Sequence, residues 1–130
     1  DYDEAYQLKH VALRYFNASG GSPDGLIGEQ HDPESHIIPV CLQAVLGLRP
    51  GVTVFGDDYD TPDGTCVRDY IHVDDLAQAH IQAIEHLARG GESVMLNVGT
   101  GKGYSVKEVI DCVEKVTGKK LNVTMGSRRA

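Results

Sequence analysis

Apolar and polar positions alternate along this chain in a way that predicts strands and helices in turn. Short runs of β-branched and aromatic residues predict strands over 11–16, 52–55, 66–73, 94–98 and 121–125. Apolar residues spaced three and four apart predict helices over 36–47, 74–89 and 105–118, after a charged, helix-like opening segment. Strands that alternate with helices are typical of α/β folds with parallel sheets.

Start and stop signals define two of these helices. Asp74 is the expected N-cap of the longest helix, and Gly90 and Gly91 are expected to end it. One apolar stripe along that helix consists of Leu76, Ala77, His80, Ile81, Ile84, Leu87 and Ala88. In the last helix, Ser105 and Glu108 have the spacing of a capping box, and Gly118 is a C-terminal stop signal.

Composition limits the classes of function. The chain has 130 residues, which favours a single domain over 1–130, and 19 acidic against 12 basic residues give a net charge of -7. That charge disfavours nucleic acid as a partner, and no apolar run approaches the roughly 18 residues of a membrane span. Both ends fall within predicted elements, so we expect a piece of a longer polypeptide.

Three cysteines, Cys41, Cys66 and Cys112, offer no paired spacing for disulfides or a structural zinc site. A cytoplasmic location is therefore expected. The six histidines show no H-x-x-x-H or H-E-x-x-H spacing, so we expect no metal site, and His80 is interpreted as a hydrogen-bonded core residue.

Two other motifs favour structural interpretations. The segment Gly99–Gly103 lies between a strand and a helix, but its spacing fails the G-x-G-x-x-G dinucleotide pattern, which favours a plain tight turn. The acidic loop before Cys66 places Asp63 where a calcium-binding EF-hand loop needs glycine, which favours a solvated turn.

Three residues suggest ligand contacts. Asn17 ends a strand and opens a long polar loop over 17–35, and Phe55 ends another strand with its ring available for stacking on a base. Arg68 stands among acidic residues. Local spacing leaves two alternatives for it, an ion pair with Asp69 or a neighbouring carboxylate, or a bound anion.

Six segments in order resemble the UDP-glucose 4-epimerase family of extended short-chain dehydrogenases/reductases. They are LRYFNASG, GLIGE, HIIP, VFGDDYDTPDGTCVRDYIHVDDLAQAH, LNVGTGKGYSVKEVI and a terminal RR pair. The resemblance is to the C-terminal part of that family. It implies a C-terminal substrate-binding lobe plus the last strand and helix elements of an NAD(P)-binding Rossmann-like fold. The sugar pair stays open, because UDP-pentose 4-epimerases are similar here.

The resemblance implies four residues around the diphosphate of a UDP-sugar. Asn17 would hydrogen-bond the pyrophosphate, Arg68 would grip it with Tyr70 nearby, and Arg129 would add a second cation. An arginine among acids is credible when a dianionic ligand pairs with it.

Four further residues are implied at the base and phosphate. Thr53 and Phe55 would meet the uracil through backbone contacts and ring stacking. His36 and Ile37, at the start of a helix, would face the phosphate and uracil region, where the family often has Asn in place of His36.

The family's chemistry uses NAD, a glycine-rich dinucleotide motif and a Tyr-x-x-x-Lys pair, and neither motif occurs in this chain. Tyr15, beside the cofactor, and Phe16 would line the nicotinamide and hexose side. We therefore expect a fragment that binds the UDP part of UDP-glucose or UDP-galactose, has no catalytic residues of its own and does not bind NAD alone. Its expected partner is the absent N-terminal dinucleotide-binding domain, without which self-association is also expected. The alternative is a free-standing, non-catalytic UDP-sugar-binding or interaction module.

Overall fold

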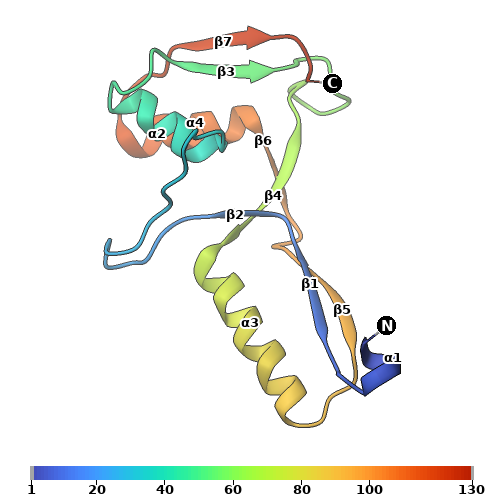
Figure 1. Cartoon of the computed structure of the whole chain (residues 1–130). Coiled ribbons are helices and arrows are strands. Elements are labelled where there is room, and N and C mark those ends of the chain that lie inside the picture. Colours follow the sequence, from blue (N-terminus) through green and yellow to red (C-terminus); the bar gives the residue numbers. More distant parts are fainter. Residues whose placement is uncertain (1, 130) are drawn as a thin grey trace. The chain divides into compact units, whose positions relative to one another are not determined.

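The computed structural model of the chain describes residues 2–129 (Figure 1). Contacts between α-carbons divide the chain into two compact units. Unit 1 contains the residues up to 28 together with 69–102, and unit 2 contains 29–68 together with the residues from 103 onward. The single domain over 1–130 therefore stays a prediction, and each unit is described by itself.

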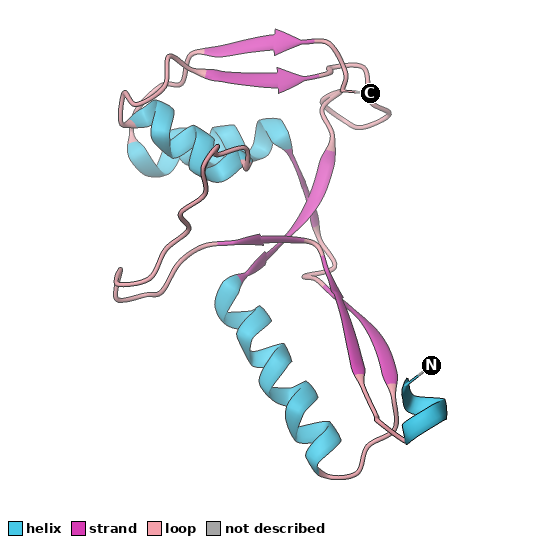
Figure 2. Ribbon diagram, in the orientation of Figure 1, coloured by secondary structure: helices cyan, strands magenta, loops and turns pink. Residues whose placement is uncertain are grey.

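Helices and strands follow the predicted order closely (Figure 2). The helices are α1 (Tyr2–Tyr6), α2 (Ile37–Val45), α3 (Val73–Ala88) and α4 (Val106–Thr117). The strands are β1 (Val11–Tyr15), β2 (Asn17–Ser19), β3 (Val52–Phe55), β4 (Val67–His72), β5 (Val94–Val98), β6 (Gly103–Ser105) and β7 (Val123–Gly126). Strand β2 takes up the first three residues of the predicted loop, and β6 begins at the last residue of the predicted turn, so neither of these short strands was predicted.

Unit 1 is built on two parallel pairs. Strand β1 pairs with β5 from Val11 opposite Val94 to Tyr15 opposite Val98, and β2 pairs with β4. Helix α3 contacts β1. None of the residues of α3 is fully buried, and Ile81 and Ile84 are exposed, so only part of the predicted apolar stripe is covered.

Helix α3 also begins earlier than predicted. Its N-cap is His72, whose ring Nδ1 accepts a hydrogen bond from the Asp74 backbone N–H at 3.2 Å, so Asp74 is already inside the first turn. His80 is exposed, and its Nδ1 lies 2.8 Å from the Leu76 carbonyl oxygen. The prediction of a core position for His80 was wrong, although its ring does have a hydrogen-bond partner.

Unit 2 contains the hydrophobic core. Strands β3 and β7 pair in parallel, and α2 and α4 contact each other. The buried cluster consists of Cys41, Val52, Val54, Ile110 and Val113. Burial of Cys41 raises the pKa of its thiol to about 11, which keeps the thiol neutral and unreactive.

Local signals at α4 are confirmed. The Ser105 hydroxyl accepts from the Glu108 N–H, and the Glu108 carboxylate accepts from the Ser105 N–H, which completes the capping box. Gly118 ends the helix with a left-handed φ of 68°.

All of the strand pairs with a described register are parallel, which confirms the α/β class. The three cysteines are free. Between residues 2 and 129, no helix has the length and apolar character that crossing a membrane requires.

Candidate functional site

The outer face of β3 presents Thr53 and Phe55. Burial alternates along the strand, so Val52 and Val54 enter the core while Thr53 and Phe55 lie on the opposite face. Thr53 Oγ1 lies 3.2 Å from Thr124 Oγ1 on β7, and Phe55 is opposite Gly126 in the register. The pairing with β7 therefore fixes the hydroxyl and the aromatic ring on one face.

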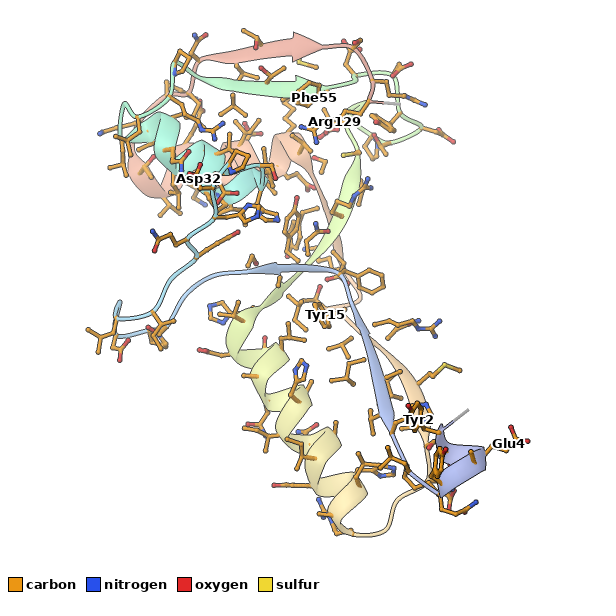
Figure 3. The ribbon with its side chains drawn as sticks, in the orientation of Figure 1. Tyr2, Glu4, Tyr15, Asp32, Phe55 and Arg129 are labelled. Carbon is orange, nitrogen blue, oxygen red and sulfur yellow. The ribbon has the colours of Figure 1, made fainter. Side chains whose placement is uncertain are left out.

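An arginine covers the ring of Phe55. The guanidinium carbon of Arg129 lies 4.1 Å from the ring centroid, and Figure 3 shows the two side chains close together. Phe55 still keeps 39% of its surface exposed. Arg129 has no carboxylate partner among the residues that the structure describes, so its charge is available to an anionic ligand.

The neighbouring arginine has a different environment. Arg128 lies 4.0 Å from the ring centroid of Tyr59, forms an ion pair with Asp58 at 3.0 Å and donates to the Asp58 carbonyl at 2.8 Å. Arg128 is therefore committed to its own loop, which makes it a natural control for Arg129.

The structure distinguishes between the two alternatives for Arg68. Its Nη1 donates to the carbonyl of Val67 at 2.8 Å, and it forms no ion pair with any residue in 2–129. The Asp69 carboxylate instead accepts from the Thr100 N–H at 3.0 Å, the Thr100 hydroxyl at 2.8 Å and the Gly101 N–H at 2.9 Å. These bonds, led by the Thr100 N–H, lower the pKa of Asp69. The local ion pair is absent, and Arg68 remains exposed without a carboxylate partner.

The same contacts explain the glycine-rich turn. A Cβ atom at Gly99 would lie 2.7 Å from Asp69 Oδ2 and 2.9 Å from a ring carbon of Phe16, so a larger residue there would force these side chains to shift. The N–H groups of Thr100 and Gly101 that a phosphate would need are bound to Asp69. The turn therefore does not fit the pyrophosphate of a dinucleotide, which supports the tight-turn interpretation.

In unit 1 the predicted residues Tyr15, Phe16 and Asn17 lie where β1 ends and β2 begins, and Tyr70 lies within β4. Asn17 is exposed and lies opposite Tyr70 in the β2–β4 register. Tyr15 ends β1 with its ring centroid 6.2 Å from that of His80, and Phe16 follows it, 54% exposed. The pairing thus brings Asn17 beside Tyr70, two residues that lie 53 positions apart in the sequence.

The start of α2 holds the two remaining predicted residues. His36 is the N-cap of α2, but its ring does not cap the helix; its Nδ1 lies 2.7 Å from Glu29 Oε1 and 3.0 Å from Glu34 Oε1. Ile37 packs against the core cluster of unit 2. Sequence reasoning assigned no role to Glu34 or His31, whose H-x-x-E-x-H spacing with His36 is the only local signal for this group.

The acidic loop has a structural role. Asp63 Oδ1 accepts from the Thr65 N–H at 2.9 Å and from the Thr65 hydroxyl at 2.7 Å, while Oδ2 accepts from the Ser105 hydroxyl. The Ser105 hydrogen bond is the leading cause that lowers the pKa of Asp63. The carboxylate ties the loop to the N-terminus of α4, and this long-range contact was not predicted.

Comparison with known proteins gives a consistent result. A family model described as "NAD dependent epimerase/dehydratase family" matches residues 1–99. The chain is 57% identical over 127 residues to a UDP-glucose 4-epimerase of Halalkalibacterium halodurans, covering 98% of this chain and 38% of the relative.

Solved structures agree in fold. The UDP-glucose 4-epimerase of Brucella ovis in complex with NAD is similar with a TM-score of 0.95 and 53% identity, over 100% of this chain and 40% of that one. The enzyme of Bifidobacterium longum in complex with NAD+ and UDP has a TM-score of 0.90 and 43% identity, over 98% of this chain and 38% of that one. The chain thus spans about two fifths of the length of these relatives.

Proposed function

The chain belongs to the NAD-dependent epimerase/dehydratase family, and we propose that it is the C-terminal, UDP-binding part of a UDP-glucose 4-epimerase. Two observations support the assignment to the C-terminal part. Neither the family's dinucleotide motif nor its Tyr-x-x-x-Lys pair occurs in the sequence. In the glycine-rich turn over 99–103, the N–H groups of Thr100 and Gly101 are bound to Asp69 and are not offered to a pyrophosphate.

The observation that carries the proposal is the exposed ring of Phe55 beside the unpaired guanidinium of Arg129. Uracil would stack on the ring in place of the Arg129 guanidinium, which would turn to the diphosphate, and base–aromatic stacking contributes about 1–3 kcal/mol per base. Thr53 would contact the uracil through its backbone from the same strand. Arg68 and Arg129 would pair with the diphosphate, because a guanidinium matches phosphate geometry and neither arginine is committed to a carboxylate in 2–129.

The contacts proposed for unit 1 rest on the resemblance to the family. Asn17 would donate its side-chain amide to the pyrophosphate, with Tyr70 beside it. Phe16 and Tyr15 would line the hexose and nicotinamide side. These assignments, like those of His36 and Ile37, stay predictions.

Exposed apolar side chains in unit 1 support the proposal that the chain is a fragment that needs a partner domain. Met95 and Leu96 on β5 and Ile81 and Ile84 on α3 are exposed by 46–68% of their surface. Strands β1 and β5 form a two-stranded sheet, which is marginal by itself. We propose that the dinucleotide-binding domain of the parent enzyme covers this surface and that the isolated chain tends to self-associate. A cytoplasmic location of the parent stays a prediction.

The isolated chain is expected to be inactive, because it would bind the substrate without supplying the catalytic groups. In the parent reaction NAD supplies hydride chemistry at the sugar, and a tyrosine accepts a proton. This chain would bind UDP tightly and the sugar weakly. The oxidised sugar could then rotate in the site and present its other face before it is reduced. No conversion of UDP-glucose to UDP-galactose is expected when NAD is added to the purified chain, and measurable turnover would contradict the proposal.

An amide NMR titration tests the binding proposal. With UDP and, separately, with UDP-glucose, saturable shifts are expected at Thr53, Phe55 and Arg68, even at about millimolar affinity, which corresponds to roughly 4 kcal/mol. The two ligands should bind similarly, because the sugar contributes little. A dispersed spectrum without shifts at these residues up to several millimolar UDP would overturn the assignment.

A further inference from the structure

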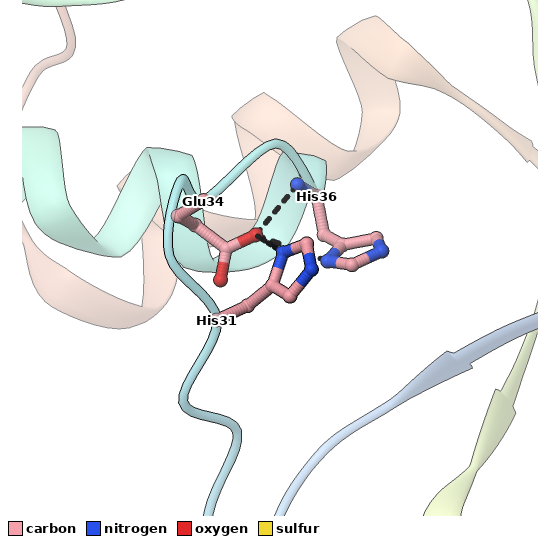
Figure 4. A group of neighbouring side chains, drawn as sticks. All are labelled: His31, Glu34 and His36. Carbon is pink, nitrogen blue, oxygen red and sulfur yellow. Dashed lines mark hydrogen bonds and ion pairs between the residues drawn. The ribbon is translucent and has the colours of Figure 1, made fainter.

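The loop that precedes α2 brings two imidazoles and a carboxylate together (Figure 4). Glu34 Oε1 lies 3.0 Å from His36 Nδ1 and 3.9 Å from His31 Nδ1, and the ring centroids of the two histidines are 5.1 Å apart. One donor atom from each of the three residues lies within 4.8 Å of the other two. We propose that His31, Glu34 and His36 bind a divalent transition-metal ion of the Zn²⁺ type.

The distances fit such an ion. A four-coordinate zinc with ligands at about 2.0–2.2 Å holds its donor atoms roughly 3.3–3.6 Å apart. The separations of 3.0 and 3.9 Å lie on either side of that value. Both histidines present Nδ1 to the carboxylate, so all three side chains can offer a donor atom to one ion.

The carboxylate is fixed in advance. The Glu34 side chain is only 4% exposed, and its Oε1 accepts from the N–H groups of Ser35 and His36 at 2.7 Å each. The Glu34 carbonyl accepts from Arg49 Nη2 at 2.7 Å, and Arg49 Nε donates to Gln43 on α2 at 2.6 Å. The side chain and backbone of the central ligand are thus held from the helix, as a preorganised ligand requires.

Contacts of the His36 ring with two carboxylates are the competing explanation, because its Nδ1 lies 2.7 Å from Glu29 Oε1 and 3.0 Å from Glu34 Oε1. Those contacts do not involve His31, whose Nδ1 lies 3.9 Å from Glu34 Oε1, beyond hydrogen-bond distance, and whose ring centroid lies 5.1 Å from that of His36. A shared cation accounts for both rings, and the carboxylates of Glu29 and Glu34 balance its two charges.

The donor set selects the class of ion. Imidazole nitrogen together with carboxylate oxygen suits Zn²⁺ and similar ions, whereas Mg²⁺ and Ca²⁺ take oxygen ligands. Three protein ligands would leave one position for water. The ion would tie the loop to the first turn of α2 through the His36 ring, in place of the phosphate contact that the resemblance implies for that ring.

Cobalt substitution tests the site on the 130-residue chain. Titration of Co²⁺ in the absence of nucleotide should give one equivalent of visible d–d absorption that Zn²⁺ displaces. His31→Gln should weaken Co²⁺ binding at least tenfold, while His10→Gln, at an exposed histidine of unit 1, should leave it unchanged. Circular dichroism of each variant checks that it folds.

A second readout needs no variant. Long-range ¹H–¹⁵N spectra of the imidazoles should show both His31 and His36 shifting with one equivalent of Zn²⁺, with Nδ1 as the coordinated nitrogen. If Co²⁺ gives no visible bands, if His31→Gln binds as tightly as the unmodified chain, or if only one imidazole shifts, the metal site is refuted and the group is an ion-pair network.

Discussion

The hydrogen bond between Ser105 and Asp63 is expected to contribute measurably to the unfolding free energy of unit 2. Ser105 is 3% exposed; its hydroxyl accepts from the Glu108 N–H at 3.0 Å and donates to Asp63. Replacing it with alanine removes an N-cap, worth about 1 kcal/mol. It also removes a hydrogen bond to a partly exposed carboxylate, worth about 1 kcal/mol more. Ser105→Ala should therefore lower the free energy of unfolding by about 2 kcal/mol.

Urea denaturation followed by circular dichroism measures this loss. Ser35→Ala is the matched control, because Ser35 is exposed and, in the described part of the chain, only its backbone N–H forms a hydrogen bond. A double-mutant cycle with Asp63→Asn isolates the side-chain contact. An unfolding free energy of Ser105→Ala within about 0.5 kcal/mol of the unmodified chain, or no coupling in the cycle, would refute the reasoning.

Two further predictions concern pH and the glycine turn. Because the pKa of Asp63 is lowered on folding, chiefly by Ser105, its stabilising contribution is present above its ordinary unfolded pKa and is lost as pH falls through the folded value. Urea midpoints should therefore fall more between pH 6 and pH 3 for the unmodified chain than for Asp63→Asn, and equal falls would contradict this account. Gly99→Ala should lower the melting temperature in a thermal scan, because its Cβ would lie 2.7 Å from Asp69 Oδ2. Gly28→Ala, in the same unit with no atom within 4 Å of the added carbon, should leave it unchanged, and equal melting temperatures for the two variants would argue against the close approach.

Sequence patterns correctly predicted those features of helices and strands that depend only on residues close together in the sequence. The Ser105–Glu108 capping box and the Gly118 stop lie within one or two helical turns of the residues they satisfy, so the sequence alone identifies them. The predicted strand over 52–55 placed Phe55 at its end with the ring available, and the structure leaves that ring 39% exposed.

Long-range contacts were beyond such patterns. Strand β2 is three residues long and forms because Asn17–Ser19 pairs with β4, not because its own residues favour a strand. The N-cap of α3 was misplaced because the His72 ring accepts from Asp74, a role in which histidine is uncommon.

In the candidate site too, features set by nearby residues were predicted, whereas features set by long-range contacts were not. Phe55 and Arg68 were identified from strand position and charge, but the absence of an Arg68–Asp69 ion pair depends on Thr100 and Gly101, more than 30 positions away. Similarly, nothing in the spacing of His31 and His36 reveals that Glu34 is buried between them.

The measurement that tests the central claim most directly is calorimetric titration of UDP into Arg129→Gln and Arg128→Gln. Both arginines lie over an aromatic ring in unit 2, but only Arg128 is paired with a carboxylate, that of Asp58, among residues 2–129. The account predicts that Arg129→Gln weakens UDP binding about tenfold, as loss of a charge-assisted phosphate contact of about 1.5 kcal/mol would, and that Arg128→Gln leaves it within about twofold. Equal effects of the two substitutions, or unchanged affinity in Arg129→Gln, would contradict a UDP site built on Phe55 and Arg129.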